Sequence, residues 1–260
     1  RDYYASRGLG DVYKRQIIDG INLNLLSLSN NISYVGPLRA TTQRYYRFQN
    51  YAVEEIDSDG KNLAMYLYNL DKESLNNFKN WTRRLFGFEV EVSSVNGNME
   101  LIINEEGKEK HNMVDVGFGY TQILPILAII WKTLYKDFAI TNYSRTTGRN
   151  QYIVAIEQPE LHLHPRLQGL FASMLVTVIK EAKEQGRDIR FIIETHSEII
   201  ISRIGQMIAT HEFSNEDINV FIFNAANEGM QNYIEKSYYS EDGQLINWPY
   251  GFFSDYVFED

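Results

Sequence analysis

The sequence predicts an α/β protein with a mainly parallel sheet flanked by helices, because strand and helix patterns alternate from Gln151 onward. Residues 151–157 (QYIVAIE) and 189–194 (IRFIIE) are continuous apolar runs, as expected of strands buried on both faces. Between them, apolar residues at helical spacing begin after Pro165 and end near Gly186. Such short strand–helix–strand connections imply right-handed crossovers and parallel pairing.

The same alternation continues toward the C-terminus. Ser197 is placed to cap a helix whose apolar residues run from Ile200 to Ile208. Residues 218–224 (INVFIFN) predict a third strand. We expect the aromatic and acidic residues 224–260 to form an extension that packs back on this lobe.

The first half of the chain predicts a more mixed structure. Residues 21–36 are expected to carry one or two strands, within a lobe that spans 17–223. An α+β insertion is predicted at about 52–113, with a helix over 74–87. A hairpin is predicted at 95–98 (VNGN), since Asn-Gly takes the positive φ angles of a tight turn.

Residues 1–16 (RDYYASRGLGDVYKRQ) differ from the rest of the chain, because they have neither a helical nor a strand period. They resemble a translated sequencing adaptor of the kind found at the ends of open reading frames from metagenomic assemblies. We therefore expect them to be non-native, with the natural protein beginning upstream of Ile17. The alternative is a genuine surface loop.

Composition narrows the class of protein. Hydrophobic residues make up 44% and charged residues 23%, which is typical of a globular protein. The net charge of -9 argues against a surface broadly coated for nucleic acid, although a local basic groove stays open. The absence of cysteine excludes disulfides and thiolate metal sites and fits the cytoplasm. The apolar run 123–131 is shorter than the roughly 20 residues that span a membrane.

Two segments place glycines or a carboxylate at the start or end of an expected helix or strand. Gly117 and Gly119 precede a helix from about Thr121, whose N-terminus can bind an anion; a simple turn before a buried helix is the alternative. Glu157 ends a buried strand, where open α/β sheets bind ligands and a carboxylate suits magnesium. A solvated charge at the strand end is its alternative.

Two further segments carry candidate side chains. In residues 192–198 (IIETHSE), His196 can hydrogen-bond a phosphate or position a water, unless the segment only caps a helix through Ser197. Residues 34–48 interleave arginines with aromatic residues, so Arg39 and Arg44 are candidate nucleic-acid contacts. An amphipathic turn with solvated arginines explains the same pattern.

The segments VGFGYTQ, IVAIEQPELHLHP and IIETHSE, in this order, resemble the ATPases related to ABC and SMC heads, in particular the RecF-like and OLD-like AAA group. The resemblance covers most of residues 32–260 and includes GPLR near the start. NWPYGFF (247–253) resembles an uncharacterised C-terminal domain of bacterial AAA ATPases, some associated with antiphage defence. The resemblance implies the C-terminal part of an ABC/SMC-head-like P-loop NTPase fold.

The resemblance also implies a nucleotide shared between two subunits. Gly117, Gly119 and Gln122 lie in a signature-like segment, which in ABC-type dimers faces the γ-phosphate bound by the partner subunit. This arrangement implies a homodimer joined through ATP. Arg39 belongs to the GPLR segment, to which the resemblance assigns no role.

The same resemblance implies roles for five residues near the metal and the attacking water. Glu157 occupies the Walker B position for Mg2+, His164 lies in the D-loop region, and His196 matches the switch histidine. Gln158 stands where a catalytic glutamate is usual, and an amide can orient a water but cannot accept its proton. Glu160, two residues on, is a candidate substitute base.

The 260 residues contain no G-x-x-x-x-G-K-[ST] phosphate loop, which a lost N-terminal lobe would explain. The expected complete protein binds ATP and Mg2+, hydrolyses ATP and switches between monomer and dimer with the nucleotide. This chain alone should be inactive. DNA repair or phage defence, with a nuclease or DNA as partner and without membrane contact, is the expected setting.

Two alternatives stay open. The first is a nucleotide-binding interaction module without turnover that recruits a nuclease or DNA. The second is a metal-dependent hydrolase, since His162 and His164 follow a strand with carboxylates nearby and could bind zinc.

Overall fold

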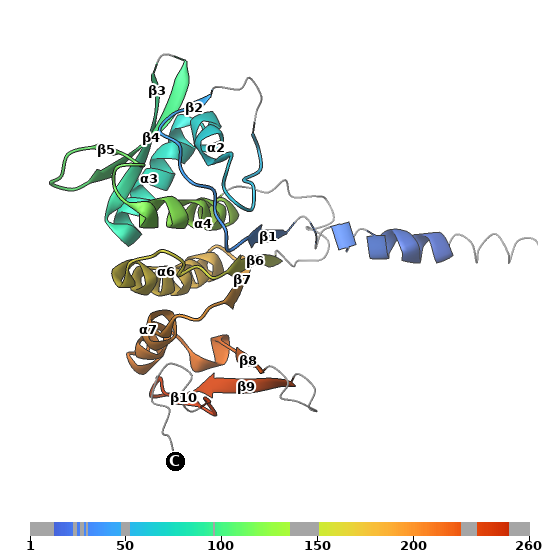
Figure 1. The fold of residues 1–260 in the computed structure, drawn as a ribbon. Helices are drawn as coiled ribbons and strands as arrows, with labels where there is room; N and C mark the ends of the chain where they lie inside the picture. The colour runs from blue at the N-terminus through green and yellow to red at the C-terminus, as the bar shows by residue number, and fades with distance from the viewer. Residues whose placement is uncertain are drawn as a thin grey trace, which may run out of the picture.

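The three parallel strands at the centre of the molecule are β1 (Ile32–Val35), β6 (Gln151–Glu157) and β7 (Asp188–Glu194), in this order (Figure 1). They are paired parallel throughout, with Tyr34 beside Ala155 and Glu157 beside Glu194. The predicted α/β class is confirmed. The structure, a computed structural model, describes residues 13–22, 25, 26, 29, 31–47, 53–95, 97–135, 151–224 and 233–249.

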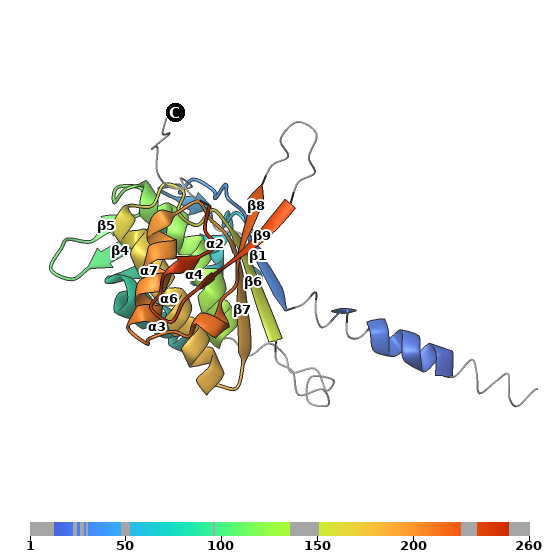
Figure 2. The ribbon, with the colours of Figure 1, turned by 90° about the horizontal axis from the view of Figure 1, so that it is seen from below.

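The two crossovers of this sheet carry helices on one face. α4 (Phe118–Tyr135) precedes β6, and α6 (Pro165–Glu184) joins β6 to β7. Right-handed crossovers that step in one direction across a sheet place their helices on the same side, as Figure 2 shows. The opposite face exposes Ile32, Tyr34 and Ile192 by 45%, 46% and 62%. Among the described residues, the sheet is therefore covered on one side.

The predicted insertion forms a layer beyond α4 (Figure 1). Its helix α3 (Lys72–Phe86) ends at Gly87, whose φ of 78° permits a left-handed C-cap. The predicted hairpin forms between β3 (Phe88–Val95) and β4 (Asn98–Glu105), which pair in full register. The layer also contains β2 (Tyr46–Arg47), α2 (Leu63–Asn69) and β5 (His111–Asn112).

α4 is buried on all sides, because the insertion covers it on one side and the sheet and α6 cover it on the other. Every residue from Thr121 to Leu134 is buried. Across the contact with α3, the rings of Phe78 and Trp131 meet edge to face at 5.2 Å between centroids. An all-round apolar helix needs such enclosure. No helix in the described part of the chain is long and apolar enough to span a membrane.

The predicted third strand forms in the C-terminal part but does not join the parallel sheet. β8 (Val220–Asn224) pairs antiparallel with β9 (Tyr233–Tyr239), which also pairs with β10 (Leu245–Ile246). This sheet follows α7 (Glu198–Ala209) and the short 3-10 helix η1 (Asn215–Asp217). A hairpin partner next along the chain satisfies the hydrogen bonds of β8 without a crossover.

The C-terminal sheet contacts α7 closely. The hydroxyl of Tyr239 donates to the carbonyl of Ile201 at 2.9 Å, and a Cβ built on Gly205 would lie 2.4 Å from the carbonyl oxygen of Gly243. The two backbones thus approach each other where neither residue has a side chain. The final residues 250–260 lie outside the described part of the chain.

The start of the chain is helical before β1. The described residues of 13–29 form a helix, and among the described residues of 21–36 one strand, β1, is present, in agreement with the one or two predicted. This helix lies away from the body of the molecule, and Ile17, Ile18 and Ile21 are exposed (Figure 1). Without a neighbouring strand, a helix is the structure that satisfies backbone hydrogen bonds locally. Residues 1–12 lie outside the described part.

Candidate functional site

Two carboxylates meet where β6 and β7 end. Glu157 and Glu194 are register partners at the carboxyl ends of these parallel strands. Glu157 accepts a hydrogen bond through Oε1 from the hydroxyl of Tyr34 at 2.8 Å, which raises the pKa of Tyr34. Among the described residues, neither Oε2 of Glu157 nor the side chain of Glu194 has a hydrogen-bond partner. This sheet edge thus presents carboxylate oxygens to solvent.

Tyr34 was missing from the predicted site, although the strand period contains the signal. In β1, Tyr34 pairs with Ala155 of β6. Residues 155 and 157 point to the same face because side chains alternate along a strand. A tyrosine can reach the diagonal neighbour two residues along the next strand. The sequence left the pairing of β1 with β6 undetermined.

The turn after β6 has an unusual backbone. Gln158 has a φ of 43°, in the left-handed region that is costly for a residue with a side chain. Its N–H donates to the carbonyl of Glu194 at 2.8 Å, and its own carbonyl accepts from the N–H of Leu161 at 3.2 Å. The side-chain amide of Gln158 makes no hydrogen bond to the described residues. The amide group is thus available to a ligand at the turn that follows Glu157.

Glu160 connects the turn after β6 to the loop after β7. Its Oε2 accepts from the hydroxyl of Thr195 at 2.7 Å, and its Oε1 accepts from the backbone N–H of His196 at 2.7 Å. Thr195 Oγ1 in turn accepts from the N–H of Ser197 at 3.0 Å. Both oxygens of Glu160 are therefore engaged by the neighbouring loop. Thr195 carries part of this link and was not among the predicted residues.

His196 stands at the end of this link with an exposed side chain. Its imidazole makes no hydrogen bond to the described residues. Ser197 caps α7, as predicted, by accepting from the N–H of Ile200 at 3.1 Å. Ser197 also donates to Oε1 of Gln168 in α6 at 2.6 Å. The backbone of His196 is thus fixed while its ring faces solvent.

The glycine segment lies against the turn after β6. Gly117, with a φ of 101°, is exposed and directly precedes α4, which begins at Phe118 rather than at about Thr121. A Cβ on Gly119 would lie 3.4 Å from the carbonyl oxygen of His162. Gln122, one turn further, is 2% exposed and faces Arg39. The structure thus brings Gly119 against the turn and joins Gln122 to it through Arg39, whereas none of the described residues lies within 4 Å of a Cβ built on Gly117.

His162 and His164 do not converge on one point. The ring of His162 packs edge to face on Phe118, 4.9 Å between centroids. His164 caps α6, with Nδ1 accepting from the N–H of Arg166 at 3.2 Å. In the described part of the chain, no group of three or more His, Asp or Glu side chains is arranged to hold a metal. The zinc hydrolase alternative has no support in this geometry.

The two candidate nucleic-acid contacts differ in exposure. Arg39 is buried at 6% exposure and donates to three protein oxygens, so its guanidinium is not available to a phosphate. Arg44 is exposed and forms an ion pair with Asp115, two residues before Gly117. Of these two arginines, Arg44 is therefore the one that presents a cation near the glycine segment.

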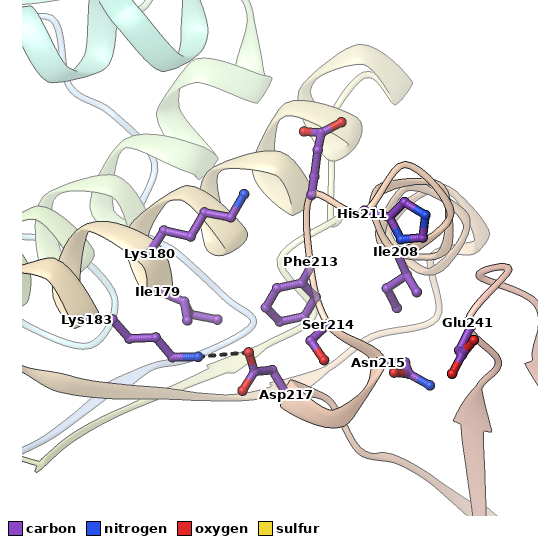
Figure 3. A pocket seen from close by; sticks show the side chains of 11 residues that line it. Ile179, Lys180, Lys183, Ile208, His211, Phe213, Ser214, Asn215, Asp217 and Glu241 are labelled. Atoms are coloured by element: carbon purple, nitrogen blue, oxygen red, sulfur yellow. Dashed lines mark hydrogen bonds and ion pairs between the residues drawn. The ribbon is translucent and has the colours of Figure 1, made fainter.

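A cavity of about 470 Å³ lies elsewhere, between the ends of α6 and α7 (Figure 3). Ile179 and Phe213 give it apolar walls, and Lys183 pairs with Asp217 at its rim at 2.8 Å. These residues are at the C-terminal ends of helices that begin at the sheet edge, roughly 20 Å away at 1.5 Å per helical residue. The cavity contains none of the candidate site residues.

The carboxylates at this sheet edge suit a magnesium ion that also binds waters and phosphates. They suit less well a metal whose ligands all come from the protein. Mg2+ is commonly held by one or two carboxylates together with waters and substrate phosphates. Glu157 has an unengaged oxygen and a second carboxylate, Glu194, beside it in register. This donor set, hard and carboxylate-only, is the chemistry that magnesium prefers.

Comparison with solved structures finds several SMC heads of low identity. One is described under the heading structural biochemistry of ATP-driven dimerization and DNA-stimulated activation of SMC ATPases. It is 13% identical, with 63% of this chain and 82% of that chain covered, and the TM-score is 0.39. The Smc head bound to the C-terminal domain of ScpA from Pyrococcus furiosus is 10% identical (63% and 34% covered, TM-score 0.36). The Smc head from Pyrococcus yayanosii is 12% identical (65% and 27%, TM-score 0.38).

Comparison by sequence identifies the family. No curated protein matches the chain significantly. A family model described as an AAA ATPase domain matches residues 21–201, which is more than half of the chain and includes β1, α4, β6 and β7. The chain therefore belongs to the AAA ATPase domain family.

Proposed function

We propose that this chain forms the catalytic edge of an ATPase that binds ATP and Mg2+ and hydrolyses ATP to ADP and phosphate. Membership of the AAA ATPase domain family supports the binding of ATP. The observation that carries the proposal is the meeting of Glu157 and Glu194 in register at the ends of β6 and β7. Open α/β sheets bind ligands at this edge.

The residues of the edge have separate tasks in this proposal. Glu157 holds Mg2+, which when bound neutralises the charge of phosphate oxygens. Gln158 orients the attacking water through its unengaged amide, and His196 hydrogen-bonds the γ-phosphate. Phosphoryl transfer depends mainly on positioning and electrostatics, so an amide in place of a carboxylate is compatible with slow turnover.

Glu160 has two candidate tasks. As a base, it would have to give up hydrogen bonds that both of its oxygens accept. As a support, it would hold the loop of His196 in place. The geometry favours the second, and the two tasks predict different results for the Glu160→Gln substitution.

The phosphate loop would come from a lobe outside these residues. The exposed apolar side chains Ile32, Tyr34 and Ile192 support this, because parallel sheets are normally covered on both faces. Ile192→Lys should leave the stability of this chain unchanged but destabilise the complete protein by about 1–3 kcal/mol. Equal urea midpoints for the two complete proteins would exclude a covering lobe at Ile192.

Two copies would share the nucleotide, with Gly117 and Gly119 of one copy facing the γ-phosphate held by the other. Gln122, which is buried against Arg39, would support this segment from the inside. ATP would thereby switch the complete protein between monomer and dimer. A cytoplasmic role in DNA repair or phage defence, with a nuclease or DNA as partner, remains our proposal for the setting. Arg44, exposed beside the glycine segment, is the residue we propose for nucleic-acid contact.

The test is magnesium-dependent phosphate release by the complete protein. Glu157→Gln should lower kcat by about 10²-fold or more, since a metal ligand is lost. Glu184→Gln, the same change on the exposed end of α6, should leave kcat unchanged. Unaltered, magnesium-dependent hydrolysis in Glu157→Gln would reject the proposed metal site.

The second candidate is nucleotide binding without turnover, and Gln158 favours it because an amide cannot accept a proton. In this case ATP would produce a dimer that persists without phosphate release. Light scattering after gel filtration with ATP measures the dimer, and a phosphate assay on the same sample measures turnover. Restored hydrolysis in Gln158→Glu would identify the glutamine as the cause.

A further inference from the structure

Arg39 is a buried cation at the junction of three segments. Its Nη1 donates to the carbonyl of Gly36 at 3.3 Å, its Nη2 to the carbonyl of Gln158 at 3.2 Å, and its Nε to Oε1 of Gln122 at 3.4 Å. Burial lowers the pKa of Arg39 to about 10, and the charge of Glu160 acts in the opposite direction. The guanidinium therefore stays charged at neutral pH, and its planar fork serves acceptors on three elements.

The acceptor at Gln158 belongs to a strained turn. Gln158 has a φ of 43°, which costs roughly 1–2 kcal/mol for a residue with a side chain. Such a conformation persists where surrounding contacts overdetermine it. Here the carbonyl of Gln158 accepts from both Arg39 and the N–H of Leu161, and the N–H of Gln158 is bonded to Glu194. Two of these bonds come from the backbone, and Arg39 supplies the one that comes from a side chain.

The acceptor at Gln122 belongs to the first turns of α4. Gln122 is 2% exposed, and its Nε2 has no hydrogen-bond partner among the described residues. Within this part of the chain, its amide is therefore oriented by Arg39 alone, through Oε1. Gly119, three residues earlier, lies close to the carbonyl of His162 in the same turn that contains Gln158, since a Cβ built on Gly119 would be 3.4 Å from this oxygen. The start of α4 and the turn after β6 are thus joined at two points, and one of them is Arg39.

We propose that Arg39 is a positioning residue that holds the Gln158 peptide in its left-handed conformation and couples it to the start of α4. This inference rests on the proposed function for its consequence, since it would link the segment facing the partner's nucleotide to the residue that orients water. The physical link itself requires no nucleotide. Its loss should loosen the turn locally and leave distant elements unchanged.

The experiment measures amide exchange in the complete protein without nucleotide. In Arg39→Met and Arg39→Lys, the amides of Leu161 and Leu163 should exchange about tenfold faster. Neither substitute can serve three separated acceptors, and the lysine variant retains the charge should the methionine variant fail to fold. Exchange in β3 and β4 should be unchanged. The control Lys110→Met, which removes a surface ion pair with Glu91, should change none of these amides.

Turnover provides the second measurement. In Arg39→Lys, kcat for ATP should fall about tenfold while KM stays within about twofold, because the substitution disturbs the water-orienting group rather than nucleotide binding. Unchanged exchange at Leu161, or equally faster exchange throughout the protein, would overturn the inference. If the unmodified protein has no ATPase activity, the proposed function fails, and the exchange result still decides the role of Arg39.

Discussion

The carboxylate of Glu160 accepts a hydrogen bond from the backbone N–H of His196 at 2.7 Å, and another from the hydroxyl of Thr195 at 2.7 Å. Glu160 and His196 are thereby joined across the ends of two neighbouring strands. The imidazole of His196 itself is exposed and makes no hydrogen bond to the described residues. The position of His196 thus depends on a residue 36 positions earlier in the chain.

Removing this carboxylate should loosen the loop after β7. Glu160→Ala is expected to lower the free energy of unfolding by about 1–3 kcal/mol, because two bonds to a charged acceptor are lost. Glu160→Gln should lose less, since its amide can still accept from His196. Urea unfolding measures both. Equal midpoints for Glu160→Ala and the unmodified chain would show that the loop has other anchors.

The same variants separate the two tasks of Glu160 in turnover by the complete protein. A general base would be lost equally in Glu160→Gln and Glu160→Ala, because neither can take a proton. A support for His196 would survive largely in Glu160→Gln and fall in Glu160→Ala by about tenfold or more. We expect the second pattern in a phosphate-release assay. Matching losses in the two variants would restore Glu160 as the base.

The contact between α7 and the C-terminal sheet should be sensitive to a single methyl group. Gly205→Ala places a Cβ 2.4 Å from the carbonyl oxygen of Gly243, so we expect a loss of about 1–3 kcal/mol. Gly169→Ala in α6 is the matched control, because nothing lies within 4 Å of its Cβ. It should gain about 0.5–1 kcal/mol from helix propensity. Thermal or urea unfolding of both variants measures the contrast, and a stabilised Gly205→Ala would contradict the close approach.

Alkaline pH should destabilise the fold through the half-buried Tyr135. Burial, and then a hydrogen bond to Glu181 at 2.8 Å, raise the pKa of Tyr135 to about 12. An unfolded tyrosine loses its proton near pH 10, so between about pH 10 and about pH 12 the folded state retains a proton that the unfolded state has lost. The stabilisation present below pH 10 is therefore lost across this window.

Urea midpoints measured between about pH 9 and about pH 11.5 test whether stability falls as the pH rises. Tyr135→Phe should show a shallower fall than the unmodified chain. Tyr238→Phe, on the exposed side of β9, should retain the full slope. An identical slope in Tyr135→Phe would show that other groups cause the alkaline loss.

Much of the fold was predictable because its signals are local. The period of β6, the proline at the start of α6, the cap at Ser197 and the Asn-Gly turn each act within a few residues. The position of Glu157 at the end of a buried strand arises from the same pattern. The antiparallel pairing of β8 with β9 was not predictable in this way, since it depends on which neighbouring strand is available.

The sequence by itself determined the alternation of elements and the residue types that stand at each strand end. Only the tertiary structure decided that Tyr34 bonds to Glu157, that Arg39 is buried against Gln158, and that Glu160 holds the loop of His196. These pairs are separated by 123, 119 and 36 positions. Periodicity reports which face a side chain occupies, whereas strand order and register determine what it meets there.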